Sequence, residues 1–304
     1  MEVALATWAK LPGLSEDDQA LVPALYSLGV AVSPTVWSDA GAEWGRFDAI
    51  ILRSTWDYHR RVREFLGWVD RAGKSTALWN PPALVRWNSN KTYLRDLGRQ
   101  GVPVVPTRFG RDVAEARQVL SEEGWDRAVV KPAVSAAGDR TFLVGPPERA
   151  RPDAAAPWTD LLDAGELLVQ PYRDEVERTG ERSLVFLAGQ YAHAFLRAPH
   201  LVPSTPLIEG ASLVASAEEV RVGRKAIGAA PGRPLYARVD LVTGPSGDPE
   251  LMELELIEPF LGLRTSPDGA SAFARAIVNA LRGRPAADRP SPETGRGTSS
   301  GSPG

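Results

Sequence analysis

The segment PELMELELIEP, residues 249–259, alternates acidic and apolar side chains, and this alternation decides the fold. In a β-strand successive side chains point to opposite faces, so Glu253 and Glu255 share one face while Met252 and the leucines point into a core. An acidic edge strand that faces solvent would produce the same pattern. The segment therefore predicts a strand with two carboxylates on one side, and its neighbours must show what those carboxylates do.

A second strand with an acid on the same face precedes this segment. The run LYARVDLVTG places Arg238 and Asp240 on one face, and the turn PSGD joins the two runs as an antiparallel pair. Carboxylates from neighbouring strands repel one another and raise their own pKa values unless a cation lies between them. Mg²⁺ takes oxygen ligands and keeps positions for water and phosphate oxygens. We therefore predict that Asp240, Glu253 and Glu255 hold one or two Mg²⁺ ions, with Mn²⁺ as an alternative.

Glu258 is a further candidate ligand. Its position predicts the opposite face of the strand unless the chain bends before Pro259. The sequence leaves open whether Glu258 replaces Glu253 or Glu255 at the metal.

The composition is that of a globular protein, with hydrophobic residues making up 43% of the 304 residues and charged residues 24%. The net charge of −3 excludes the basic surface that nucleic-acid binding needs. There is no cysteine and there are only three histidines, which excludes disulfides, thiolate nucleophiles and cysteine-ligated zinc. No apolar run reaches the roughly 20 residues of a membrane span, and the N-terminus lacks signal-peptide features. We expect a cytoplasmic protein with no membrane or nucleic-acid partner.

Two lysines point to an anionic ligand. Lys91 opens the helix-like run NKTYL, and Lys131 lies in the apolar run VVKP, where a buried lysine is unfavourable without an anion beside it. Phosphate suits both lysines. The small residues SAAG that follow, 135–138, would let backbone N–H groups approach phosphate oxygens, although the same letters also make an ordinary hairpin turn.

The first 85 residues alternate strand-like and helix-like runs, which predicts a small parallel α/β domain. One of these strands ends in ILRSTWDYH, residues 51–59, where polar and aromatic side chains follow the apolar run. Ligands of open parallel sheets bind beyond the carboxyl ends of the strands, so we expect this stretch to bind substrate. A loop that packs on its own domain is the alternative. The candidate residues are Arg53, Ser54, Thr55, Trp56, Asp57 and Tyr58.

Shorter strand-like and helix-like runs follow, and a capping box of Ser216 and Glu219 predicts the start of one helix. The last stretch is rich in Pro, Gly, Ser and Thr without an apolar anchor, so we expect it to be disordered. The predicted parts are an N-terminal domain (1–85), a small lobe (86–168), a C-terminal lobe (169–284) and a disordered tail (285–304).

Three tryptophans in the N-terminal domain, Trp37, Trp44 and Trp68, could line a homodimer surface. Packing on their own domain is the preferred interpretation.

Taken in order along the chain, these features resemble the ATP-grasp superfamily. The matching elements are Lys91, VVKP, the loop 135–138, VQPY (169–172), GERS (180–183), ARVD (237–240) and ELELIEP (253–259). The branch that this chain resembles contains O-ureido-serine cyclo-ligase and D-alanine–D-alanine ligase. The resemblance implies an α/β fold in which the small parallel domain is followed by a two-lobed ATP-grasp with antiparallel sheets.

The resemblance also implies roles for the residues that match the family motifs. Lys91 and Lys131 would contact phosphates, the loop would cover them, and backbone groups at the VQPY hinge would read the adenine edge. An acid after the hinge would bind the ribose, and Glu177 and Glu181 are both candidates. The implied ATP-binding residues are Lys91, Lys131, Ser135, Ala136, Gly138, Gln170, Tyr172, Glu177 and Glu181.

The implied chemistry centres on three arginines and the metal acids. Arg182 and Arg238 would stabilise the transferred phosphate as catalytic residues, and Arg197 would meet the substrate. The family usually has Asn at the last metal position, where this chain has Glu255.

The expected enzyme is an ATP- and Mg²⁺-dependent C–N ligase of natural-product biosynthesis. It would activate a carboxyl-type group of a small amino-acid-like substrate as an acyl phosphate for attack by an amine. When the amine belongs to the same molecule, this attack would close a ring. A non-catalytic binding protein with this fold and a small-molecule kinase are the alternatives. The branch has a segment resembling GDFRVQ…GG where this chain has HLVPSTPLIEGASL, residues 200–213, so the substrate is less defined than the nucleotide.

Overall fold

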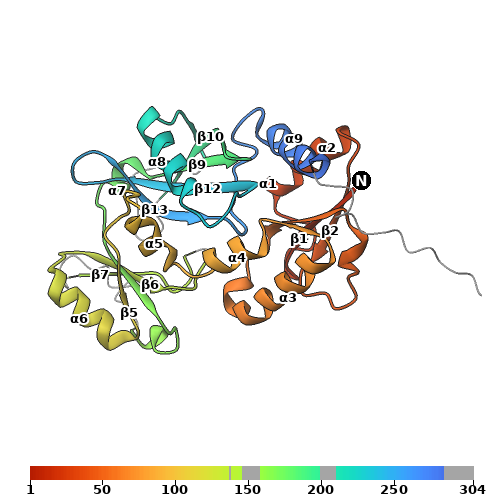
Figure 1. Cartoon of the computed structure of the whole chain (residues 1–304). Helices are drawn as coiled ribbons and strands as arrows, with labels where there is room; N and C mark the ends of the chain where they lie inside the picture. Colours follow the sequence, from red (N-terminus) through yellow and green to blue (C-terminus); the bar gives the residue numbers. More distant parts are fainter. Residues whose placement is uncertain (137, 146–157, 199–209, 284–304) are drawn as a thin grey trace, which may run out of the picture.

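The computed structural model describes residues 1–136, 138–145, 158–198 and 210–283 and contains three β-sheets (Figure 1). The N-terminal sheet is parallel and the other two are antiparallel. The predicted α/β fold, a small parallel domain followed by two lobes with antiparallel sheets, is confirmed. In this described part no helix combines the length and the apolar character needed to cross a membrane.

The N-terminal sheet has four parallel strands in the order β2-β1-β3-β4. Ser15 caps the first helix, because its hydroxyl accepts a hydrogen bond from the N–H of Asp18. The strands are β1 (Glu2–Thr7), β2 (Ala31–Val36), β3 (Ala49–Ser54) and β4 (Ala77–Trp79). The helices are α1 (Glu16–Gln19), α2 (Leu21–Ser27) and α3 (Val62–Ser75), with 3-10 turns η1 (Trp44–Arg46) and η2 (Tyr58–Arg61).

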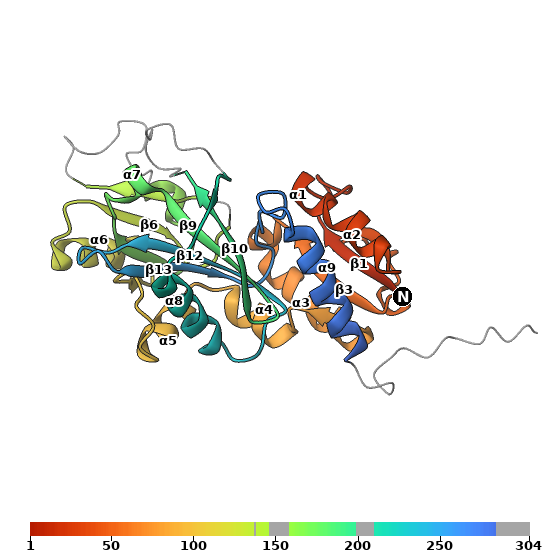
Figure 2. The same ribbon diagram turned by 90° about the horizontal axis from the view of Figure 1, so that it is seen from above.

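Both faces of this sheet are covered, which is why its strands are apolar on both sides. Leu5 and Ile51 pack on one face, and Ile50 and Leu52 on the other with Phe65 of α3. The first face is covered by α2 and by the last described helix, α9 (Gly269–Arg282). Figure 2 shows α9 beside α2 and β1. The end of the described chain therefore completes the core of its beginning.

The small lobe is a four-stranded antiparallel sheet in the order β5-β8-β6-β7, covered by α6 (Val113–Glu123). Gly110 is required where β5 meets α6, since a Cβ there would lie 2.7 Å from the backbone N of Ala116. Its strands are β5 (Arg108–Gly110), β6 (Ala128–Pro132), β7 (Phe142–Val144) and β8 (Leu167–Pro171). The turn η3 (Trp158–Leu161) precedes β8.

The large lobe is a five-stranded antiparallel sheet in the order β11-β10-β9-β12-β13, with α8 (Ala217–Gly228) on one face. The predicted capping box of Ser216 and Glu219 opens α8. Its strands are β9 (Glu181–Leu187), β10 (Gln190–Arg197), β11 (Ser212–Leu213), β12 (Tyr236–Thr243) and β13 (Pro249–Glu255). The remaining helices are α4 (Pro82–Asn88), α5 (Tyr93–Arg99) and α7 (Val176–Thr179).

The acidic strand β13 lies at the edge of the large sheet, and buried side chains close its outer edge. Asn88 donates 2.8 Å to the carbonyl of Leu254 and accepts at 2.8 Å from the N–H of Leu256. Asn80 donates 2.6 Å to the carbonyl of Leu256, and the hydroxyl of Tyr93 accepts from the N–H of Leu254. These contacts supply the hydrogen bonds that a further strand would otherwise make, and they fix the backbone that carries Glu253 and Glu255.

The tryptophans proposed for a dimer surface pack inside the N-terminal domain instead. Trp37 and Trp68 are buried, and Trp44 lies against Trp68 with ring centroids 5.0 Å apart. Their apolar area is thus covered by their own domain, and the idea that they line a dimer surface is wrong. The tail predicted for 285–304 lies outside the described residues, and the division at 85, 168 and 284 stays a prediction.

We expect Asn88→Ala to lower the free energy of unfolding by about 2–4 kcal/mol, because it leaves a buried carbonyl and a buried N–H without partners. Urea unfolding followed by tryptophan fluorescence measures this change. Asn279→Ala, which removes an exposed asparagine of α9, is the control and should change stability by less than about 0.5 kcal/mol. Equal losses in the two variants would contradict the role of Asn88.

Candidate active site

A cavity of about 390 Å³ lies between the small lobe and the large lobe. One part is apolar and the other is lined by charged side chains from both lobes. The apolar lining is Val105, Val129, Val176, Val242 and Met252. The charged lining is Lys91, Lys131, Arg173, Glu181, Arg197, Glu253 and Glu255.

The two predicted lysines meet one predicted acid across this cavity. Nζ of Lys91 lies 2.9 Å from Oε1 of Glu253, and Nζ of Lys131 lies 3.9 Å from Oε2. Burial favours the neutral form of Glu253, but the two lysines outweigh it and hold its pKa at about 2. Burial also lowers the pKa of Lys131, an effect that Glu253 opposes. The arrangement is a buried charge cluster that a polyphosphate and a cation could enter by separating its partners.

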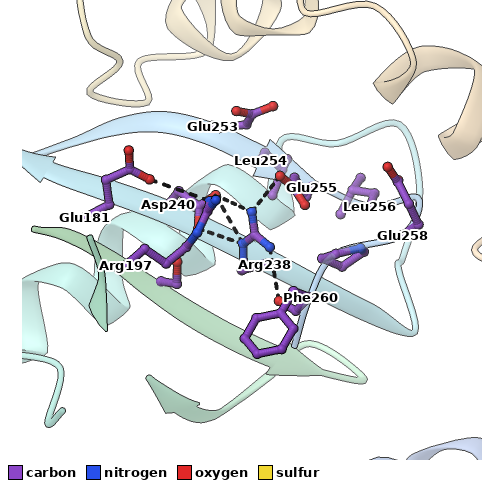
Figure 3. A network of polar contacts seen from close by, with 12 residues as sticks. Glu181, Arg197, Arg238, Asp240, Glu253, Leu254, Glu255, Leu256, Glu258 and Phe260 are labelled. Carbon is purple, nitrogen blue, oxygen red and sulfur yellow. Dashed lines mark hydrogen bonds and ion pairs between the residues drawn. The ribbon is translucent and has the colours of Figure 1, made fainter. Parts of the chain in front are cut away.

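Figure 3 shows a second cluster on the same face of the sheet, centred on Arg238. Its guanidinium binds both carboxylate oxygens of Asp240, at 2.8 and 2.9 Å, and lies 2.5 Å from Oε1 of Glu255. It also donates to the carbonyl of Phe260, and Ser183 donates 2.6 Å to Asp240. The register explains this closeness, because Asp240 pairs with Glu253 and Arg238 with Glu255 across the two strands. Arg238 is thus held rigidly beside Glu255, which lines the cavity, although Arg238 itself is not part of the lining.

Arg197 and Glu181 form the adjoining wall. Nη1 of Arg197 lies 3.6 Å from a carboxylate oxygen of Glu181 and 3.6 Å from one of Asp240. Burial raises the pKa of Glu181 to about 7, and Arg197 only partly offsets this. The other ribose candidate, Glu177, binds Arg127 at 2.9 Å and does not line the cavity. The position of Glu181 therefore favours it as the ribose acid.

The predicted adenine hinge lies beside the apolar part of the cavity. Gln170, near the end of β8, and Tyr172, just beyond it, both line the cavity. The N–H of Tyr172 donates to the carbonyl of Arg127 at 2.8 Å, so it is already used within the sheet. The side chain of Gln170 donates to Thr107. The N–H of Tyr172 is therefore not free for a ligand, and the adenine role of this segment stays a prediction.

The predicted phosphate loop also lines the cavity, through Ser135, Ala136 and Gly138; Ala137 lies outside the described residues. The carbonyl of Ser135 accepts a 2.6 Å hydrogen bond from Lys91, and the hydroxyl of Ser135 donates to Pro132. Gly138 has φ +70°, a conformation that favours glycine. The start of the loop is thus attached to the lysine that faces Glu253.

The catalytic role predicted for Arg182 is contradicted. Arg182 pairs with Glu219 of α8 and donates to the carbonyl of Val214. Side chains alternate along β9, so Glu181 and Ser183 face the cavity side while Arg182 faces the helix that covers the other side.

The stretch Arg53–Tyr58 is largely engaged inside the protein. Arg53 is buried, binds Asp18 at 2.7 Å and donates to the carbonyl of Pro259 at 2.8 Å. Tyr58 is buried among aromatic side chains of the N-terminal core, which contradicts its predicted role as a substrate wall. Asp57 accepts from the indole of Trp37 at 2.7 Å, so a substrate amine would have to displace that contact.

The other members of this stretch lie at the same sheet edge. Ser54 donates 2.6 Å to Asp18, and the indole of Trp56 reaches the carbonyl of Glu258 at 3.4 Å. Nη1 of Arg53 and Oγ1 of Thr55 are buried and have no hydrogen-bond partner among the described residues. These two atoms are the ones still available to a ligand at this edge, where the predicted substrate roles remain predictions.

The apolar residues of the cavity lining were not predicted from the sequence, although the alternation of side chains along two strands indicates part of them. Val129 lies two residues before Lys131 on β6, and Val242 two residues after Asp240 on β12, so each shares a face with a predicted site residue. Met252 was expected in the core. A bulge between β12 and β13 instead turns it into the cavity, and Leu251 packs with Leu254 in its place.

Two of the three predicted metal ligands are available to an ion. Glu253 and Glu255 line the cavity on one face, which suits Mg²⁺ because this ion usually takes one or two carboxylates and completes its shell with water and phosphate. Burial raises the pKa of Glu255, Arg238 opposes this, and the neighbouring carboxylates of Glu253 and Asp240 raise it further. Within the described residues no three acidic or histidine side chains are grouped as a complete metal site. Asp240 can join only after Arg238 and Ser183 release it.

The fourth acid, Glu258, is buried beyond the end of β13, and burial and the nearby Glu255 raise its pKa well above the usual value. It does not line the cavity. The arrangement therefore favours Glu253 and Glu255 over Glu258 as ligands.

Comparison with known proteins agrees with this geometry. The family model described as "D-cycloserine synthetase DcsG, N-terminal domain" matches residues 3–80. The cycloserine biosynthesis protein DcsG of Streptomyces lavendulae is 32% identical to this chain over 295 residues, covering 92% of this chain and 99% of the relative.

Solved structures show the same relationship. The crystal structure of D-cycloserine synthetase DcsG matches with a TM-score of 0.83 at 31% identity and covers 92% of this chain and 100% of its own. D-alanine–D-alanine ligase from Bacillus anthracis, complexed with ATP, has a TM-score of 0.63 at 15% identity and covers 93% and 97%. The ATP-grasp ligase PsnB, complexed with Mg and ADP, has a TM-score of 0.60 at 17% identity and covers 92% and 97%. The last two similarities concern the fold. The chain belongs to the DcsG family of the ATP-grasp superfamily and is an ATP-dependent C–N ligase.

Proposed function

We propose that the cavity binds Mg·ATP and that the enzyme uses it to activate a carboxyl group of a small amino-acid-like substrate for attack by an amine. The observation that carries this proposal is the contact of Lys91 and Lys131 with Glu253 across the cavity. The contact brings Lys131 of the small-lobe strand β6, and Lys91, which precedes α5, to a candidate metal-binding carboxylate of the large lobe. Adenine would occupy the apolar part, with the ribose at Glu181.

The charged side chains would act mainly by electrostatics. When a triphosphate enters, Lys91 and Lys131 would exchange Glu253 for phosphate oxygens, and Glu253 and Glu255 would hold Mg²⁺. The ion would neutralise charge on the phosphates. We also propose that one or two Mg²⁺ ions bind and that Mn²⁺ can replace them. Arg238, fixed by Asp240, and Arg197 would offset the charge on the transferred phosphoryl group.

The reaction needs no side-chain nucleophile. A carboxylate oxygen of the substrate attacks the γ-phosphorus, the bond to ADP breaks, and an acyl phosphate forms. An amine nitrogen then attacks the acyl carbon, phosphate leaves, and the nitrogen loses a proton. Water must be excluded because it would hydrolyse the acyl phosphate, and a site enclosed between two lobes serves that purpose.

The substrate class is proposed from the relative, whose name assigns it to cycloserine biosynthesis. An amine and a carboxyl-type group in one molecule would close a ring by this chemistry, and in two molecules would form an amide. The segment in which this chain departs from the branch, residues 200–213, lies mostly outside the described residues. Because the sequence departs from the branch there, we propose a small amino-acid-like substrate other than that of the relative. We also propose that the enzyme acts in the cytoplasm and that it forms a homodimer.

Lys131→Met should lower kcat/KM for ATP by about 100-fold or more, because it removes a buried positive charge from the phosphate site. ADP release measured by a coupled assay tests this. Lys74→Met, which changes an exposed lysine of α3, should leave ADP release unchanged. Full activity in Lys131→Met would contradict the proposed phosphate site.

Glu255→Gln should raise the Mg²⁺ concentration needed for half-maximal activity by about tenfold, since one carboxylate ligand is lost. A magnesium titration at saturating ATP measures the shift. Glu250→Gln breaks the pair with Arg173 further along β13 and serves as the comparison. If only Asp240→Asn changed the magnesium requirement, the assignment of Glu255 would be wrong.

ADP release should require a carboxyl-bearing substrate and an amine, whether in one molecule or two, because acyl phosphate formed without an amine is not turned over productively. A screen of small amino acids with Mg·ATP, read by ADP release and by product mass, tests this. A phosphorylated product that accumulates would indicate a kinase. No ADP with any substrate would favour a binding protein.

A further inference from the structure

The turn η2, which follows β3, makes a direct contact with the small lobe. Nε2 of His59 lies 3.1 Å from Oδ2 of Asp139, and Nη2 of Arg60 lies 3.7 Å from Oδ1 of the same carboxylate. Asp139 belongs to the loop between β6 and β7 that also contains Ser135 and Gly138. The N-terminal domain therefore contacts the loop that lines the proposed phosphate site.

The imidazole of His59 is held on a rigid base. The two residues that precede His59 are fixed in the N-terminal core. Asp57 accepts a hydrogen bond from Trp37 at 2.7 Å, and the ring of Tyr58 packs on Phe65 with ring centroids 5.1 Å apart. The side chain of His59 is 6% exposed and that of Asp139 is 32% exposed, so the hydrogen bond is shielded from water on the histidine side. A shielded bond to a charged partner stabilises more than an exposed one.

The loop itself is fixed near both ends. Lys91 donates to the carbonyl of Ser135 at its start, and the N–H of Lys91 donates to the carbonyl of Ala133. Beyond Gly138, the N–H of Asp139 donates to the carbonyl of Ala136, which closes a tight turn. Ala136 also packs against the aromatic core of the N-terminal domain. Lys91 and His59 thus hold the loop from two different elements.

We infer that His59 is a positioning residue for the nucleotide: through Asp139 it holds the β6–β7 loop where that loop lies over the triphosphate, and Arg60 assists it. This inference rests on the proposed function, which places the phosphates at this loop. It also explains why β3 ends in hydrogen-bonding and aromatic side chains. They join the N-terminal domain to the small lobe and also to Glu258 and Pro259, which follow the strand β13.

The experiment measures nucleotide affinity by calorimetry in the full chain, with Mg·AMPPNP and with AMP as the two probes. His59→Ala and Asp139→Ala should each weaken Mg·AMPPNP binding by about tenfold and leave AMP binding unchanged, because AMP does not reach the loop. The double variant should be no weaker than either single variant, since the two residues act as one pair. His59→Gln, whose amide can still donate to Asp139, should restore most of the affinity.

The control is Asp70→Ala, which removes an exposed ion pair to Arg86 in the same domain and should change neither affinity. Equal losses for Mg·AMPPNP and AMP in the His59 and Asp139 variants would show a general structural defect and overturn the inference. Additive losses in the double variant would overturn it too. If the unmodified protein binds neither probe, the proposed function fails; if it binds both and the variants bind as well, only the inference fails.

Discussion

The ion pair between Lys91 and Glu253 is the interaction on which the arrangement of the site depends. Lys91 is buried and the side chain of Glu253 is 18% exposed, so each charge would be unfavourable without the other. Lys91 binds Ala133 and Ser135 of the small lobe, while Tyr93, two residues further on, binds Leu254 of the large lobe. The pair therefore lies where the two lobes join, and it leaves opposite charges available for exchange with a nucleotide and its cation.

The alternation of side chains in the sequence was enough to predict the acidic face of β13 and its pairing with β12, because a period of two is a property of the strand itself. The bulge at Met252 could not be predicted, since an extra residue in one strand depends on how the partner strand twists. Arg182 shows the opposite case. The alternation along β9 places Arg182 on the opposite face from Glu181, whereas the motif by itself does not show which face a residue takes.

The polar stretch after β3 shows a different limit. The rule that ligands bind beyond the carboxyl ends of parallel strands pointed to this edge, but it could not show that Asp18, Trp37 and the carbonyl of Pro259 would satisfy most of its side chains. Those partners come from distant parts of the sequence. Asn80 and Asn88 were missed for the same reason: an isolated asparagine gives no sign that its amide will bind a strand far along the chain.

The closed outer edge of β13 has a consequence beyond the site. An uncovered edge strand offers a row of unpaired backbone groups that can recruit a strand from another molecule and start aggregation. Here two asparagine amides and a tyrosine hydroxyl occupy those groups at Leu254 and Leu256, and backbone groups of Pro103 and Val105 bond Leu251. Most of this protection comes from side chains and not from a further strand, so the strand can keep its acidic face open to a reaction while its edge is closed to intermolecular pairing.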